Sequence, residues 1–144
     1  SSDFTEVRAV VTETRYILKA LNAKDVTLHF IKSEIVNENS EIIKKMAGLK
    51  EVKESSQGSG LKLTAAKAEC WLDIDSSIAK EYVSELSSKA ERQEQIIKQL
   101  ESRLANKSYV ANAPEQVVEQ TKQQLQEASE LLDSIKAEAE RFKA

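Results

Sequence analysis

The side chains with the most reactive chemistry do not form a catalytic pattern. The chain has one histidine, His29, and one cysteine, Cys70, so neither a zinc site nor a nucleophilic triad can be completed. Asp73 and Asp75 form a carboxylate pair, but they directly precede a helical segment, where acidic side chains cap the helix start. There is also no glycine-rich phosphate loop. We expect no catalytic residue, no metal site and no cofactor in this chain.

Basic side chains in the second half of the chain are better candidates, and the chemistry that they suggest is phosphate binding. Lys89 and Arg103 are two heptads apart, as are Lys122 and Lys136. This spacing keeps charges on the flank of a helix, where they can contact successive phosphates. The candidate contacts are Lys89, Arg92, Arg103, Lys107, Lys122 and Lys136. The alternative is a solvated face whose cations pair with neighbouring glutamates, and charge runs are usually of this kind.

Tyr109 is the aromatic candidate, since an exposed aromatic ring can stack on a nucleic-acid base. Alternatively, Tyr109 and Val110 form an apolar plug at the open end of a pair of helices, and their adjacency favours the plug.

Two long segments with uninterrupted heptads must position these residues. Steps of three and four alternate along both apolar seams, which is the repeat of a coiled coil. The first seam is Val83, Leu86, Ala90, Gln93, Ile97, Leu100 and Leu104, and the second is Val118, Thr121, Leu125, Ala128, Leu132, Ile135, Ala139 and Phe142. The connection between them is short and ends at Pro114, which predicts an antiparallel hairpin within one chain. We therefore expect a monomer.

The first half of the chain predicts a small α+β segment. Apolar residues have helical spacing over residues 4–21, and residues 26–31 alternate as in a strand. A short helix closed by Gly48 follows, and then strands over residues 49–54 and 61–73. The fold class is mainly α, a long antiparallel two-helix coiled coil preceded by this segment. The expected domains are residues 1–75 and 76–144.

The composition limits the possible partners. The formal net charge is -3, so only a local stripe of cations could attract a polyanion. The single cysteine and the absence of a long apolar run favour a reducing compartment and no membrane partner. We expect a cytoplasmic protein, with an organelle as the alternative. The start at Ser1, without an initiator methionine, suggests a fragment of a longer protein.

The region between the two long helices resembles a known family. Leu104-Ala105-Asn106, Tyr109-Val110, Ala113-Pro114 and Val117-Val118-Glu119 are similar to the pattern at the tip of the C-terminal arm of valyl-tRNA synthetases. The resemblance extends from Glu101 to the C-terminus and is looser upstream. The preceding α+β segment also fits, since a small mixed segment connects the anticodon-binding domain to the arm in this family.

The resemblance implies a non-catalytic arm that contacts the outer corner of tRNA(Val) and supports valine aminoacylation. The parent would be an ATP-dependent valine-tRNA ligase of class I, whose ATP-binding signatures are absent from this chain. A-form major grooves are too narrow to read, so recognition would use phosphate, ribose and exposed loop bases. The alternatives are a coiled-coil interaction or scaffold module, which a second apolar stripe at Ile96, Leu131 and Ala137 would favour, and the RNA-binding tail of a ribosome-associated ATPase.

Overall fold

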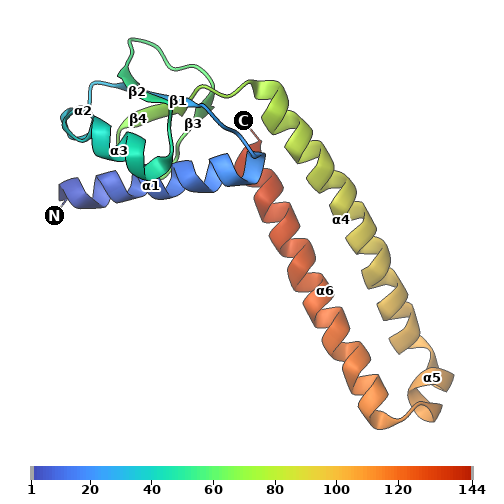
Figure 1. The fold of residues 1–144 in the computed structure, drawn as a ribbon. Coiled ribbons are helices and arrows are strands. Elements are labelled where there is room, and N and C mark those ends of the chain that lie inside the picture. The colour runs from blue at the N-terminus through green and yellow to red at the C-terminus, as the bar shows by residue number, and fades with distance from the viewer. Residues whose placement is uncertain (1, 144) are drawn as a thin grey trace. The chain divides into compact units, whose positions relative to one another are not determined.

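The computed structural model describes residues 2–143 (Figure 1). Ser1 and Ala144, the outer bounds of the two expected domains, lie outside the described residues. The chain divides into two compact units, residues 1–79 and 80–144. The first helix of the hairpin starts slightly before this division, at Ser76.

The first unit is a sheet with helices packed on one face (Figure 1). The sheet order is β2-β1-β4-β3, in which β1 pairs in parallel with β2 and all other pairs are antiparallel. The helices are α1 (Ser2–Leu21), α2 (Glu34–Glu38) and α3 (Ser40–Ala47), and the strands are β1 (Thr27–Ile31), β2 (Glu51–Glu54), β3 (Leu61–Lys62) and β4 (Glu69–Leu72). The core contains Leu28 and Phe30 of β1, opposite Leu72 and Cys70 of β4, all nearly inaccessible to solvent.

Two elements of this unit differ from the sequence-based expectation. The short helix α2 was not expected. Its N-cap Ser33 accepts a hydrogen bond from the backbone N–H of Val36, 3.1 Å away. The strand expected over residues 61–73 is two short strands, because residues 64–68 leave the sheet and bind carboxylates of α1.

Two buried glutamates of α1 hold that intervening loop. The Glu13 carboxylate accepts hydrogen bonds from the backbone N–H of Thr64 at 2.9 Å and of Ala65 at 2.8 Å. Two helical turns earlier in α1, Glu6 accepts hydrogen bonds from the backbone N–H groups of Lys67 at 2.9 Å and Ala68 at 2.8 Å. A heptad separates the two glutamates, which therefore lie on the same face of α1. They pair with backbone donors of a loop that has no partner strand and so hold it on α1.

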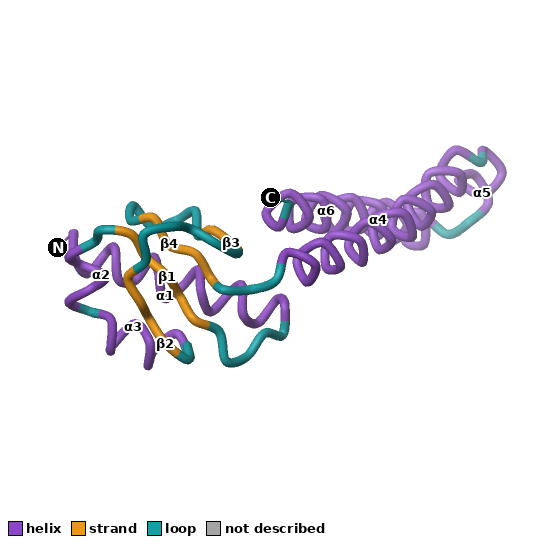
Figure 2. Tube along the Cα trace, turned by 90° about the horizontal axis from the view of Figure 1, so that it is seen from above, coloured by secondary structure: helices purple, strands orange, loops and turns teal. Residues whose placement is uncertain are grey.

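The second unit is the expected antiparallel hairpin, and with the small sheet before it this confirms the predicted fold class. Figures 1 and 2 show α4 (Ser76–Ala105) and α6 (Glu115–Phe142) side by side along their length. The helix α4 starts where Asp75 Oδ1 accepts from the Ser77 N–H at 2.8 Å, which is the capping role predicted for that carboxylate. Pro114 is the N-cap of α6. The connection contains a short helix, α5 (Lys107–Asn112), that the heptad pattern did not predict.

The seam of the hairpin is the one that the heptads predict. Every seam residue on both helices is buried or half-buried, whereas most of the residues between them are exposed. With Val83 and Val118 at position a of the heptads, the d positions are the most buried: Leu86, Gln93, Leu100, Thr121, Ala128, Ile135 and Phe142. All a positions except Val118 remain half-exposed. Within residues 2–143, no helix is long and apolar enough to cross a membrane.

Candidate nucleic-acid interface

The hairpin has two different edges, which follow from its heptads. With Val83 and Val118 at position a, antiparallel helices bring e positions together along one edge and g positions together along the other. Two contacts show this arrangement: Lys136 Nζ lies 3.8 Å from Glu94 Oε1, both at e, and the Tyr82 hydroxyl donates to Glu138 Oε2 at 2.6 Å, both at g. We call these the e edge and the g edge.

The structure distributes the predicted phosphate contacts over both edges. Lys89 and Arg103 occupy g positions of α4, and Arg92, at the neighbouring c position, lies beside them. Lys122 and Lys136 occupy e positions of α6 and therefore lie on the opposite edge. Lys107 is exposed in the first turn of α5 at the tip. The hairpin thus brings Lys89, Arg92 and Arg103 together and separates them from the two α6 lysines.

The lysines of the e edge already have carboxylate partners. Lys122 Nζ is 3.2 Å from Glu119 and Lys143 Nζ is 3.0 Å from Glu140, in addition to the contact of Lys136 with Glu94. These pairs are exposed, so each contributes little to stability. They nevertheless neutralise this edge, as the solvated-face alternative predicts.

The g edge has cations without such partners. Among the residues that the structure describes, no carboxylate forms an ion pair with Lys89, Arg92 or Arg103, and the same holds for Lys107 at the tip. The g edge therefore keeps three positive charges available to a ligand, with a fourth at the end of the hairpin.

Two large apolar side chains also lie on the g edge. Ile96 is 46% exposed and Leu131 is 50% exposed, and both occupy g positions. In the buried seam, Gln93 Nε2 donates to the Ala128 carbonyl at 3.0 Å. Ile96 lies one turn after Gln93, and Leu131 lies one turn after Ala128. Neither Ile96 nor Leu131 was predicted to bind RNA; the sequence indicated both, with Ala137, only as candidates for a second apolar stripe of an interaction module. The g edge thus combines unpaired cations with exposed apolar surface.

The shapes of the two edges differ as well. The half-exposed a residues leave a groove of about 540 Å³ on the e edge, whose floor includes Val83, Ala90 and Ala139. On the g edge the d residues are buried, and the ring of Tyr82 packs edge-on against Phe142 with 4.9 Å between ring centroids. The g edge is therefore filled, and its side chains project from a closed surface.

Tyr109 fastens the tip to α6. The Thr121 hydroxyl donates to the Val117 carbonyl at 3.1 Å, so the Tyr109 hydroxyl, 2.9 Å from Thr121 Oγ1, acts as the donor in that contact. Asn106 caps α5 by accepting from the Tyr109 N–H at 3.2 Å. The half-buried Tyr109 fits the predicted plug, whereas Val110 is exposed and takes no part in it.

Cys70 and His29 of the first unit are positions of the sheet, and their surroundings do not form a reactive site. Burial raises the pKa of the Cys70 thiol from 9.0 to about 12, with smaller contributions from the charges of Glu6 and Glu13. Such a thiol is not a nucleophile near neutral pH. His29 lies on β1 between Lys53 of β2 and Trp71 of β4. Within residues 2–143, no group of His, Cys, Asp and Glu side chains could hold a metal ion.

Comparison with known proteins gives two matches. Residues 78–143, which comprise nearly the whole hairpin, match the family described as the valyl-tRNA synthetase tRNA-binding arm. The chain is also 27% identical over 145 residues to the valine-tRNA ligase of Thermotoga maritima. That similarity covers 94% of this chain and 16% of the ligase, so the chain spans only a small part of the length of that relative.

Proposed function

Because residues 78–143 match the valyl-tRNA synthetase tRNA-binding arm, we propose that this chain is the non-catalytic tRNA-binding part of a valine-tRNA ligase. Its partner is tRNA(Val), and its contribution is affinity and orientation while other parts of the enzyme bind ATP and valine. The chain itself works as a monomer and without a cofactor, in the cytoplasm. The observation that carries the proposal is the family match over residues 78–143, and the unpaired cations on one edge of the hairpin supply the contacts with RNA.

The g edge is the RNA-binding face in this proposal. Lys89, Arg92 and Arg103 are free to neutralise phosphates, and binding then releases counterions from the RNA. Ile96 and Leu131 offer apolar surface to ribose and to bases that are unstacked or at the end of a stack. Such bases occur in the loops of a folded RNA, not within its A-form stems. The combination therefore favours a looped corner of tRNA over a helical stem.

The e edge contributes less to binding. An RNA phosphate at Lys122 or Lys136 would have to displace Glu119 or Glu94, and both glutamates would then lie close to a polyanion. We therefore assign the phosphate contacts to Lys89, Arg92, Arg103 and Lys107, and keep Lys122 and Lys136 as residues of the opposite edge. Tyr109 acts by positioning the tip, because its hydroxyl is engaged by Thr121.

The dimensions of the hairpin suit a long contact. The 30 residues of α4 extend about 45 Å and the 28 of α6 about 42 Å at 1.5 Å per residue. A rod of this length can reach across one face of a folded RNA. Since the net charge of the chain is -3, binding depends on the local charges of the g edge.

Salt dependence tests the proposal. The affinity of this chain for tRNA(Val) is measured over a range of salt concentrations for a g-edge variant, Lys89→Gln/Arg92→Gln/Arg103→Gln. Its matched control on the e edge is Lys122→Gln/Lys136→Gln/Lys143→Gln, which removes the same number of charges. Each lost phosphate contact reduces the magnitude of the negative slope of log affinity against log salt by about 0.7. The slope of the g-edge variant should therefore be shallower by roughly 2. Equal slopes for the two variants contradict the assignment of the edge, and no loss in either contradicts phosphate binding by the flanks.

The exposed apolar pair on the g edge favours a second candidate, a coiled-coil interaction module. A partner helix could pack on Ile96 and Leu131 without any RNA. Sedimentation distinguishes the two candidates. A dimer that the Leu131→Glu substitution dissociates supports the interaction module, whereas a monomer that binds tRNA supports the arm. The third alternative, a tail of a ribosome-associated ATPase, has no support from the family match.

A further inference from the structure

The first unit carries an apolar groove between α1 and α3, on the side of these helices away from the sheet. Three of its side chains are exposed to an unusual degree for large apolar residues: Phe4 at 65%, Ile42 at 50% and Met46 at 51%. Val7 and Val11 of α1 line the groove between them. Its volume is about 890 Å³. Contiguous exposed apolar surface of this kind marks a binding surface in soluble proteins.

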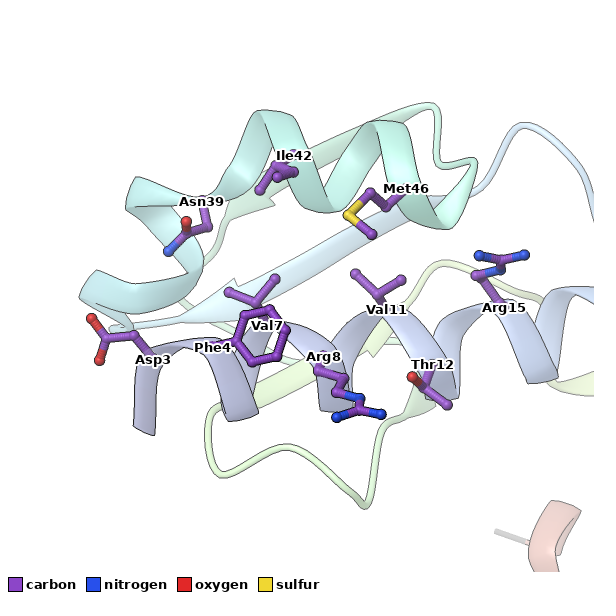
Figure 3. A pocket seen from close by; sticks show the side chains of 10 residues that line it. All are labelled: Asp3, Phe4, Val7, Arg8, Val11, Thr12, Arg15, Asn39, Ile42 and Met46. Atoms are coloured by element: carbon purple, nitrogen blue, oxygen red, sulfur yellow. The ribbon is translucent and has the colours of Figure 1, made fainter. Parts of the chain in front are cut away.

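The groove is elongated along α1. Its lining residues on that helix run from Asp3 to Arg15, about 18 Å at 1.5 Å per residue. Figure 3 shows Ile42 and Met46 of α3 along one wall, facing Val7 and Val11, with Asp3 and Asn39 at one end and Arg15 at the other. A trough of about three helical turns, open along its length, fits a helix better than it fits a small molecule, whose sites are enclosed and have converging polar groups.

Two cations determine which helix would fit. Arg8 and Arg15 line the groove one heptad apart on α1. Both are exposed, and neither has a carboxylate partner among the described residues. Along α1 they are separated by about 10.5 Å, which is also the separation of two carboxylates a heptad apart on a second helix. The charge on this wall is therefore complementary to an acidic flank with the same spacing.

From these observations we infer that the α1–α3 groove binds an amphipathic helix whose apolar stripe is flanked by carboxylates one heptad apart. Phe4, Val7, Ile42 and Met46 receive the apolar stripe, and this burial supplies most of the affinity. Arg8 and Arg15 select acidic partners over basic ones, because charge complementarity governs specificity more than affinity. The inference is independent of the proposed tRNA binding, since all of these residues lie in the first compact unit and the test below uses no RNA.

A pair of synthetic helical peptides tests the inference on the whole chain. Both peptides carry leucines at i, i+3, i+7 and i+10. One has glutamates a heptad apart on the flank of this stripe, and the other has lysines at the same positions. Fluorescence anisotropy of the labelled peptides measures binding. The glutamate peptide should bind roughly tenfold more tightly than the lysine peptide, because two attractive contacts become repulsive in the latter. Equal affinities would overturn the role of the arginines.

Variants of the groove complete the test. Arg8→Glu/Arg15→Glu should reverse the preference between the two peptides, and Met46→Glu should abolish binding of both. Ile78→Ser, which alters an exposed isoleucine outside the groove, is the matched control and should bind as the unaltered chain does. Met46 is exposed, so its variant is expected to fold, and circular dichroism checks this; Ile42→Ser is the milder second variant. Unchanged peptide binding by folded Met46→Glu would overturn the inference. A dimer of the chain that Met46→Glu dissociates would also overturn it, because the occupant of the groove would then be a second copy of the chain.

Discussion

At the scale of single residues, the buried glutamates of α1 do the most specific work in the first unit. Glu13 accepts hydrogen bonds from two backbone N–H groups and from the Thr64 hydroxyl at 3.0 Å. Glu6 accepts from two further N–H groups. A short loop outside the sheet thereby keeps its donors satisfied through side chains of a helix more than 50 residues earlier. The sequence did not indicate this, because Glu6 and Glu13 look like ordinary charges of an exposed helical face.

Removal of the Glu13 carboxylate should therefore destabilise the unit. We expect Glu13→Ala to lower the free energy of unfolding by about 2–3 kcal/mol, since it removes the charge-assisted hydrogen bonds that the buried carboxylate accepts from Thr64 and Ala65. Hydrogen exchange of the Thr64 and Ala65 amides should accelerate along with it. Urea unfolding and exchange measurements check both effects, with the exposed Glu41→Ala as control. A similar loss in both variants would show that the loop does not depend on this carboxylate.

Cys70 makes a second prediction at this scale. Its pKa is raised to about 12 by burial, so the folded protein holds it as a neutral thiol at pH 8. Alkylation by iodoacetamide should be roughly 100-fold or more slower in the folded chain than in urea. A Cys70→Ser/Ser56→Cys variant, with its thiol in the exposed loop, should react rapidly in both conditions.

The same shift fixes the sign of a pH effect. The folded thiol keeps its proton up to about pH 12, whereas an unfolded thiol loses it near 9.0. The unfolded state therefore binds fewer protons between these values, and Cys70 lowers folding stability as the pH rises through this range. Rapid alkylation of the folded chain at pH 8 would contradict both the burial and the pH effect.

At the scale of elements, the heptads predicted α4, α6 and their seam almost residue by residue. A repeat maintained over many turns leaves one possible buried stripe, so long periodic helices are the part of a fold most accessible from sequence. The short elements were not accessible. The helix α5 depends on the cap at Asn106 and on the contact of Tyr109 with Thr121, twelve positions later in the chain. Similarly, α2 is a single turn that begins at its own cap, Ser33.

The assignment of charges to edges was also beyond the heptads alone. Positions g of α4 and e of α6 both flank the seam, and the sequence treated Lys89 and Lys122 as one set. The antiparallel pairing, which the short connection predicts and the contact of Lys136 with Glu94 shows, places them on opposite edges.

The hairpin should fail when its seam receives a charge. Leu100 is a buried d residue close to the tip, and Asp at this position would have no partner there. We expect Leu100→Asp to cost about 3 kcal/mol or more and to separate the tip-proximal turns of α4 and α6. Circular dichroism during thermal unfolding measures the loss of helix. Gln99→Asp introduces the same side chain at the adjacent exposed position and should leave the transition within a few degrees of that of the unaltered chain.

At the scale of the whole molecule, an acidic chain is proposed to bind a polyanion, and the distribution of charge makes this possible. The net charge is -3, yet Glu94, Glu119 and Glu140 pair with lysines of the e edge, whereas Lys89, Arg92 and Arg103 of the other edge have no ion pair among the described residues. The long-range attraction of RNA is therefore weak, and binding should be highly sensitive to salt. The two compact units also divide the proposed binding surfaces, with the proposed RNA face on the hairpin and the α1–α3 groove on the first unit.

The most direct test of the central claim is site-specific photo-crosslinking to tRNA(Val). A photoreactive amino acid is placed at Leu131, on the g edge, or at Ser129, half a turn away at an e position on the opposite edge. Both variants keep every cation of the hairpin, and their probes face opposite edges. We expect crosslinks from position 131 to loop nucleotides of the tRNA and few or none from position 129. Crosslinks mainly from position 129, or none from either position while the tRNA remains bound, would contradict this expectation.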